Sequence, residues 1–87
     1  MFEWDEHKNK INVIKHSIDF KLAAEVFSDP KAIIQFSREQ NGEKRYQIIG
    51  SIAGELVILL VAFTHRQDKI RIISARKASK KERQLYG

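Results

Sequence analysis

Residues 56–63, LVILLVAF, constrain the fold more than any other stretch of the sequence. All eight side chains are apolar, and no polar residue alternates with them. The run is strand-sized and well short of the roughly 18 apolar residues that a membrane-spanning helix needs. A continuous apolar strand is typical of the middle of a sheet, where both faces are covered. We therefore expect residues 56–63 to form a central strand, and we expect no membrane segment.

Four further strands are expected, over residues 2–4, 32–36, 46–50 and 69–76. The Asn41-Gly42 pair predicts a tight hairpin turn between the second and third of these, because both residues tolerate left-handed backbone. Further turns are expected near Ala53-Gly54 and over residues 65–68.

The first of three expected helices covers residues 6–16. Asp5 can cap it, because a short polar side chain at that position accepts hydrogen bonds from free backbone N–H groups. Ile11 and Ile14 would give the helix an apolar face directed at the core.

Asp19 can cap a second helix, and its apolar side chains recur at helical spacing, at positions 20, 23, 24 and 27. The pair Asp29-Pro30 would end this helix, since the residue before proline is disfavoured in helical backbone. Ser79 and Glu82 form a capping-box pattern that starts a short final helix, ending near Tyr86.

These elements predict an α+β fold in a single domain over residues 1–87. Two N-terminal helices should pack on one face of a twisted, mostly antiparallel sheet, with a short helix at the C-terminus. The other face of the sheet should stay partly open.

The basic residues are unevenly distributed along the chain. The net charge is +5 at neutral pH with neutral histidines. Residues 1–64 carry a net charge of −1, whereas residues 65–87 hold eight Lys or Arg against two acidic residues, a net of +6. This asymmetry points to a polyanion or an acidic protein as the partner.

Cysteine is absent, which excludes disulfides and thiolate metal sites and suits the reducing cytoplasm. The first six residues, MFEWDE, are acidic and have no basic segment followed by an apolar one. We therefore expect no secretion signal and a cytoplasmic protein.

Arg71 and Arg76 stand near the two ends of the last expected strand. A guanidinium offers five donors and stays charged, so it suits phosphate. Residues five apart on a regular strand point to opposite faces, so the two arginines would share a surface only with strong twist or a bulge. Arg76, the free N–H groups of the helix after Ser79 and the nearby lysines could form a phosphate cradle. Alternatively, Arg71 pairs with a surface carboxylate and the lysines are only solvated.

The three histidines have no spacing that would place two of them on one helical face, so we expect no metal site. His7 and His16 are expected to be surface or capping residues. His65, at the end of the central strand, is a candidate for proton transfer, because histidine is best suited to that role near neutral pH. Tyr86 could stack on an RNA base, donate its hydroxyl to phosphate, or cover the edge of the core.

Three stretches together resemble the BrnT family, the RNA-cleaving half of bacterial type II toxin–antitoxin pairs. They are FEWDEHKNKINVIKH with IDFKLAAEVFSDP, then KRYQIIG, and finally IRIISARKASKKERQLY. The resemblance covers almost the whole chain. It departs where family members often have proline after the Trp-Asp pair and glycine after the Lys-His pair, since Glu6 and Ser17 stand there.

The resemblance implies a RelE-like fold and a metal-independent endoribonuclease without cofactors. It also implies inhibition by a BrnA-type antitoxin that carries a DNA-binding domain, so that DNA is contacted only indirectly. The family's polar positions fall on Lys8, Asn12, Lys15, His16, Arg45, Arg71, Arg76, Glu82, Arg83 and Tyr86.

In the mechanism that this implies, the RNA 2′-hydroxyl attacks the adjacent phosphate and leaves a 2′,3′-cyclic phosphate. Arg76 and Arg71, supported by Arg45, would stabilise the developing charge. The base would be His65 or Glu82, and the acid Tyr86 or a lysine. The expected RNA-binding residues are Lys8, Lys15, His16, Lys77, Lys80, Lys81 and Arg83.

Two alternatives remain open from the sequence. The basic C-terminal part could be a non-catalytic module that binds RNA or an acidic protein. The same surface could also serve mainly as the docking site of the antitoxin.

Overall fold

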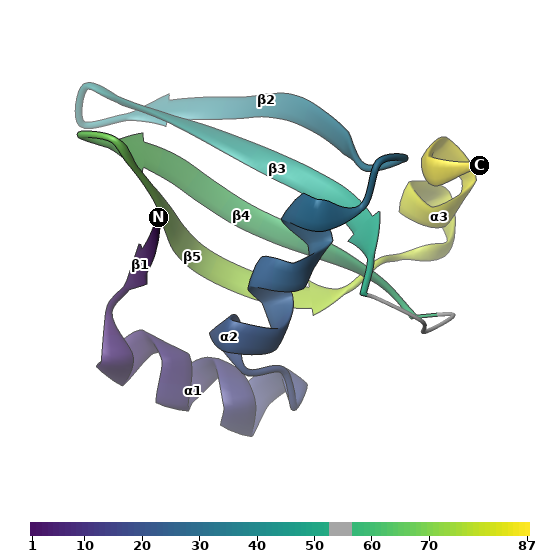
Figure 1. Ribbon diagram of the computed structural model, residues 1–87, viewed down its shortest axis with the longest axis horizontal. Coiled ribbons are helices and arrows are strands. Elements are labelled where there is room, and N and C mark those ends of the chain that lie inside the picture. The colour runs from purple at the N-terminus through teal and green to yellow at the C-terminus, as the bar shows by residue number, and fades with distance from the viewer. Residues whose placement is uncertain (53–56) are drawn as a thin grey trace.

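The computed structural model describes residues 1–52 and 57–87, and it has the expected α+β class (Figure 1). In these residues one mixed five-stranded sheet has the order β1-β5-β4-β3-β2. The strands are β1 (Phe2–Trp4), β2 (Ile33–Gln40), β3 (Glu43–Ser51), β4 (Ile58–Arg66) and β5 (Lys69–Lys77). β1 pairs with β5 in parallel, and the other three pairings are antiparallel, as expected for most of the sheet.

β4 lies in the middle of the sheet, which confirms the prediction made from the apolar run. The strand continues through His65 and Arg66, which we had expected in a turn. The turn itself is confined to Gln67 and Asp68, with Gln67 at a φ of 56°. Leu56 and the expected turn near Ala53-Gly54 lie outside the described residues.

The hairpin predicted at Asn41-Gly42 is confirmed. Asn41 has a φ of 53° and Gly42 a φ of 77°, the pair of positive values that a type I′ turn requires. The turn fixes the register, so that Gln40 lies opposite Glu43.

The first expected helix is confirmed as α1 (Glu6–His16), and the Asp5 carboxylate accepts hydrogen bonds from the N–H groups of His7 and Lys8. The second is only one α-helical turn, α2 (Phe20–Ala23), which continues as the 3-10 helix η1 (Ala24–Ser28). The residues it buries completely are Phe20, Ala23 and Val26. Ala24 and Phe27 also pack against the core, as expected, whereas the burial of Val26 was not expected and fits the three residues per turn of a 3-10 helix.

The two N-terminal helices do not share one face of the sheet, which corrects the prediction. α2 and η1 cover one face, where their side chains meet Ile48, Val61 and Phe63 in the core (Figure 1). α1 instead lies along the exposed edge of β5, beyond the short strand β1. The opposite face is not covered by α2 or η1, so we call it the open face; the C-terminal helix α3 (Lys80–Tyr86) contacts it only at one end, through β3 and Arg76 of β5.

The expected apolar face of α1 is also wrong, because Ile14 is 86% and Ile11 49% exposed. The inward side of α1 carries Asn9 and Asn12 instead. Asn12 Nδ2 donates to the carbonyl oxygens of Ile18 and Ala75, both at 2.9 Å, and its Oδ1 accepts from the Ala75 N–H at 3.2 Å. The amide thus replaces a neighbouring strand at the point where β1 has ended, and hydrogen bonds rather than apolar contacts fix α1.

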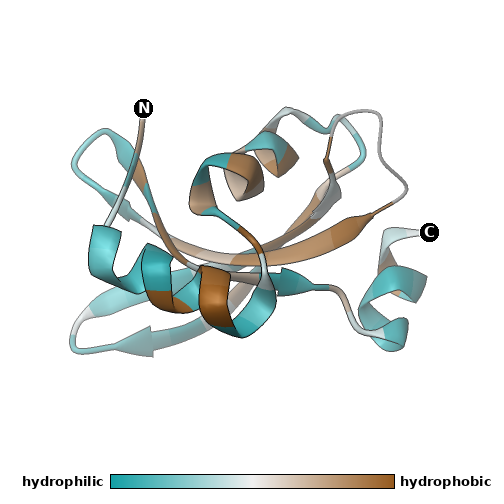
Figure 2. Ribbon diagram, turned by 90° about the horizontal axis from the view of Figure 1, so that it is seen from below, coloured by the Kyte–Doolittle hydropathy of each residue, from teal (hydrophilic) through white to brown (hydrophobic). Residues whose placement is uncertain are grey.

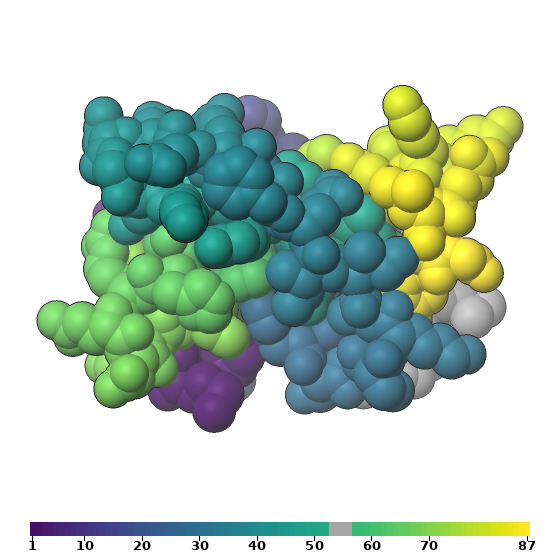
Figure 3. All heavy atoms as spheres, turned by 90° about the horizontal axis from the view of Figure 1, so that it is seen from above, coloured from purple at the N-terminus to yellow at the C-terminus, as the bar shows by residue number. Residues whose placement is uncertain are grey.

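The final helix is confirmed as α3 (Lys80–Tyr86), with the capping box of Ser79 and Glu82 complete. It packs beside the segment that follows η1, as the space-filling view shows in yellow and blue (Figure 3). No helix in residues 1–52 and 57–87 is both long and apolar enough to cross a membrane.

Candidate functional site

A β-bulge in β5 places Arg71 and Arg76 on the same face of the sheet. Ala62 of β4 lies opposite Ser74 and Phe63 lies opposite Ile72, so Ile73 is the extra residue. A bulge adds one residue to the alternation, and two positions five apart then point the same way. Ile72 and Ala75 face the core, whereas Arg71, Ser74 and Arg76 face the open side. The two arginines therefore share a surface through a bulge, which was one of the two possibilities considered from the sequence.

Arg45 belongs to the same face. Thr64 of β4 lies opposite Arg45 on one side and opposite Arg71 on the other. Residues directly opposite one another on neighbouring strands project from one face of a sheet. The three arginines that we predicted to stabilise phosphate charge thus project from one face of the sheet. Arg45 and Arg71 flank Thr64, whereas Arg76 lies farther along β5, opposite Leu60.

Arg38 extends this row on β2, where it lies opposite Arg45. Like charges directly opposite each other destabilise a sheet, which points to an anion as the missing partner. Arg45 has a buried Nε with no hydrogen-bond acceptor in residues 1–52 and 57–87, and its nearest carboxylate oxygen, of Glu43, is 3.8 Å away. The middle of the open face therefore has cationic groups that the described chain does not fully satisfy.

Arg76 is held by Glu82 in a two-pronged ion pair. Its two terminal nitrogens donate to the two Glu82 carboxylate oxygens at 2.8 and 2.9 Å. Glu82 Oε1 also accepts from the Ser79 N–H at 2.8 Å. The hydrogen bond from Arg76, with those from Ser79, lowers the pKa of Glu82 to about 2, and the same pair raises the pKa of Arg76. The expected phosphate cradle at the start of α3 is thus occupied by a carboxylate of the chain itself.

Arg71 is also paired, with Glu3 of β1 at 3.2 Å. This is the structural alternative that we considered for Arg71 from the sequence. The pair is about a quarter exposed on each side chain. An incoming phosphate can compete for such a partly exposed guanidinium, which has donors beyond the one that Glu3 uses.

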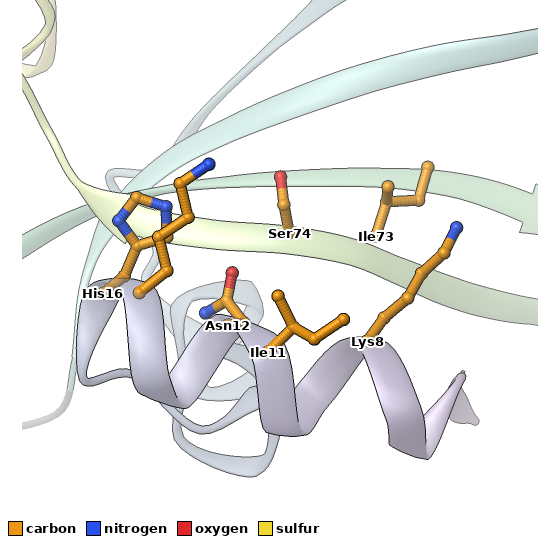
Figure 4. Close-up of a pocket in the computed structure, with 7 residues that line it drawn as sticks. Lys8, Ile11, Asn12, His16, Ile73 and Ser74 are labelled. Atoms are coloured by element: carbon orange, nitrogen blue, oxygen red, sulfur yellow. The ribbon is translucent and has the colours of Figure 1, made fainter.

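A groove between α1 and β5 opens onto this face. Its first part has a volume of about 190 Å³ and is lined by Lys8, Ile11, Asn12, Lys15, His16, Ile73 and Ser74 (Figure 4). Its second part, of about 510 Å³, is lined by Lys15, His16, Ser17, Arg76 and Lys77. Because both parts share Lys15 and His16, we treat them as one α1–β5 groove. Besides Ile11 and Ile73, its lining holds cations and polar groups and no carboxylate, which suits an anionic ligand.

His65 lies on the other face of the sheet. Its ring contacts those of Tyr46 and Phe63, with centroids 5.8 and 5.7 Å away, and Phe63 belongs to the core. The structure therefore does not bring His65 together with Arg71 and Arg76. His16, which we expected at the surface and, from the resemblance, among the RNA-binding residues, lines the groove with Arg76.

Tyr86 is engaged away from the arginine row. Its hydroxyl donates to Asp29 Oδ2 at 2.6 Å and lies 3.3 Å from Ser51 Oγ. The Tyr86 hydroxyl, with the N–H groups of Ser51 and Lys31, lowers the pKa of Asp29 to about 2. This cluster ties α3 to the segment between η1 and β2.

The remaining predicted RNA-binding residues lie around α3 and the end of β5. Lys77, Lys80 and Lys81 are exposed to solvent. Arg83 donates to the Ala78 carbonyl oxygen at 3.4 Å and lines a small cavity with Lys77. These side chains border the site rather than converge on one point.

Sequence reasoning missed Arg38, although a signal for it was present. The Asn41-Gly42 turn fixes the pairing of the two strands, and counting back from it places Arg38 opposite Arg45. We had ended the second strand at residue 36 and so left Arg38 in a loop.

Among residues 1–52 and 57–87, no group of three or more His, Asp or Glu side chains is arranged to hold a metal ion. A comparison with curated proteins gave no significant match. Residues 4–82 match the family model described as the ribonuclease toxin BrnT of type II toxin–antitoxin systems. That match spans nearly the whole chain and agrees with the resemblance seen in its motifs. The chain therefore belongs to the BrnT family of ribonuclease toxins.

Proposed function

We propose that this chain is a metal-independent endoribonuclease toxin that cleaves RNA through its own 2′-hydroxyl and so inhibits translation. The observation that carries the proposal is the bulge at Ile73, which sorts Arg71 and Arg76 onto the face that also holds Arg45. Family membership supports the reaction class, and these arginines support the part of the mechanism that stabilises charge.

In the proposed step, the 2′-oxygen forms a bond to phosphorus while the bond from phosphorus to the 5′-oxygen breaks. Negative charge grows on the non-bridging oxygens, and Arg76 is the best-placed donor, because it borders both the open face and the α1–β5 groove. Fixed donors of this kind typically contribute on the order of 100- to 1,000-fold in rate. Glu82 serves as a positioning residue, since its carboxylate fixes the orientation of the Arg76 guanidinium.

We assign the proton transfers to groove residues. Glu82, with a pKa of about 2, is too weak a base for the 2′-hydroxyl, and His65 lies on the far face. His16 is the histidine that lines the groove beside Arg76, so it is the proposed base. Lys15 lines the same groove and would give a proton to the leaving 5′-oxygen.

The test is cleavage of a defined RNA by purified protein in excess EDTA, with the product ends mapped. Wild type should give 2′,3′-cyclic phosphate ends, while Arg76→Ala and His16→Gln should each lower the rate at least 100-fold. His65→Gln is the matched control on the opposite face and should cleave within about twofold of wild type. A DNA strand of the same sequence should stay intact, because it lacks the 2′-hydroxyl.

A non-catalytic binding module is the second candidate. The carboxylate partners of Arg71 and Arg76 favour it, since both arginines are already paired in the free chain. It predicts intact RNA, retained binding and only a modest loss of affinity in Arg76→Ala. Full activity of Arg76→Ala would contradict the catalytic assignment directly.

The proposal also covers the location, fold type and partner of the toxin. With cellular RNA as the substrate, the protein would act in the cytoplasm. Its fold would be of the RelE-like type. A BrnA-type antitoxin would neutralise the toxin, and DNA would be contacted only through that antitoxin.

A further inference from the structure

The polarity of α1 is inverted relative to an ordinary surface helix. Its inward positions are Asn9, Asn12 and half-buried His16, whereas its apolar side chains point to solvent. Figure 2 shows brown apolar bands among the hydrophilic residues of α1. A helix anchored by buried amides does not need exposed isoleucines for its own packing. Their exposure calls for another explanation.

His7, Lys10, Ile11 and Ile14 form one outward stripe on α1, which we call the α1 ridge. They stand at i, i+3, i+4 and i+7, the spacing of one helical face, and all four are exposed. Ile11 also lines the α1–β5 groove, so the ridge and the groove are continuous. Whatever binds the ridge lies directly beside the proposed RNA site.

The chemistry of the ridge favours a protein over RNA. Single-stranded RNA is held by cations that follow its backbone and by aromatic rings that stack on its bases. Aliphatic Ile14 offers neither, but it can act as an apolar anchor in a protein interface.

The charge of α1 favours an acidic partner over a second copy of the chain. In a symmetric dimer the same patch meets itself, so Lys8, Lys10 and Lys15 would face one another. An acidic segment with apolar anchors would instead meet both the isoleucines and the lysines.

We propose that the α1 ridge is the docking site of the antitoxin, which presents an acidic segment with aliphatic anchors. That segment would continue from Ile14 over Ile11 into the groove, cover Lys15 and His16, and block the path of RNA to Arg76. This inference rests on the proposed function and deepens it, because it states where and how the toxin is inhibited.

The test uses the antitoxin that restores growth when it is co-expressed with this chain. Its affinity for full-length variants is measured by calorimetry, alongside RNA cleavage. Ile14→Ser should weaken antitoxin binding about 10- to 100-fold, the range for losing one buried aliphatic anchor. Lys10→Glu should weaken it by roughly 10-fold, because it puts like charges together. Both variants should retain wild-type RNA cleavage within about twofold.

Ile34→Ser is the matched control, since Ile34 is 59% exposed on β2 at the other edge of the sheet. It should bind the antitoxin like wild type. Wild-type affinity of both Ile14→Ser and Lys10→Glu would overturn the docking inference while leaving the ribonuclease intact. Loss of RNA binding in Ile14→Ser would assign the ridge to RNA, and a dimer that Ile14→Ser dissociates would assign it to a second copy. Either result contradicts the inference. Absence of RNA cleavage by wild type would instead count against the proposed function, and the calorimetric comparison would still decide the docking site.

Discussion

Ser17 ends α1 in left-handed backbone, with a φ of 60° and a ψ of 30°. Side chains with a Cβ are strained there, and glycine is not. Ser17→Gly should therefore raise the free energy of unfolding by about 0.5–1 kcal/mol. Urea denaturation measures the change, and Ser17→Ala, which keeps a Cβ, should bring no gain. Equal stabilisation by alanine would show that the left-handed backbone is not the cause.

Asp29 and Glu82 should make the free energy of unfolding decrease at acidic pH. Their pKa values fall from 3.8 and 4.5 to about 2 in the folded chain, through the Tyr86 hydroxyl and Arg76 respectively. A lowered folded pKa stabilises the protein above the unfolded value, and that stability is lost as the pH falls towards the folded value. We therefore expect the free energy of unfolding to decline between about pH 4.5 and pH 2.

Denaturation with urea at several pH values in this window measures the effect. Glu82→Gln should show a shallower decline than wild type, because it has no carboxyl to protonate at that position. The same change at exposed Glu39 is the control and should keep the wild-type slope. A wild-type slope in Glu82→Gln would contradict the assignment.

At the scale of elements, the buried amide of Asn12 joins α1 to β5. Asn12→Ala would leave the Ala75 N–H and the carbonyl oxygens of Ala75 and Ile18 without their partner. Each unsatisfied buried group costs on the order of 1–3 kcal/mol, partly relieved by water, so we expect a loss of about 2–4 kcal/mol. Amide hydrogen exchange should show α1 and the end of β5 opening together. Gln35→Ala, on the exposed strand β2, should cost little.

The attachment of α3 separates two roles for Tyr86. If the hydroxyl only holds the helix, Tyr86→Phe should lower the free energy of unfolding by about 1–2 kcal/mol. Asp29→Asn should then lower both the stability and the rate of RNA cleavage about as much as Tyr86→Phe does. If Tyr86 were instead the acid of the reaction, Tyr86→Phe alone would abolish cleavage while Asp29→Asn cleaved normally. Comparing cleavage rates with unfolding free energies for both variants decides between the two.

Much at this scale could be predicted from the sequence. Capping residues at Asp5 and Ser79, the Asn41-Gly42 turn and the apolar run of β4 are local signals, and the elements they mark are confirmed. The placement of α1 could not be predicted, because apolar spacing does not say which side of a helix meets the protein. Asn12 decides that side through bonds to Ala75, 63 residues away.

For the whole molecule, the candidate site depends on how side chains are sorted between the two faces of the sheet. Alternation predicted that Arg71 and Arg76 would be separated, and only the bulge at Ile73 brings them together. Nothing in the local sequence marks Ile73 as a bulge. The same alternation placed His65 on the core side, through its contact with Phe63, although position 65 reads equally well as a loop. The residue types of the candidate site could therefore be predicted, but which of them share a face depends on the strand register, which the sequence did not reveal.

The excess of basic residues on the open face predicts how RNA affinity should depend on salt concentration. On the open face and its rim, Arg38, Arg45, Arg66, Lys69, Arg71 and Arg76 outnumber the acidic Glu3, Glu43 and Glu82. If RNA follows this face, each lost phosphate contact should reduce the slope of log affinity against log salt concentration by about 0.7. Binding of a single-stranded RNA, measured by anisotropy from low to physiological salt, gives that slope.

Arg38→Gln and Arg45→Gln should each lower the slope, and the double variant should lower it by about 1.4 if the two contacts are separate. Lys44→Gln is the matched control, because Lys44 is next to Arg45 on β3 and so projects from the opposite face. It removes the same charge from nearly the same place, so it changes the net charge without touching the proposed RNA path. If Lys44→Gln lowers the slope as much as Arg45→Gln does, RNA affinity depends on the total charge of the protein. That result would contradict the open face as the binding surface. A loss confined to the arginines would show that the strand register, and not the basic composition alone, makes the site.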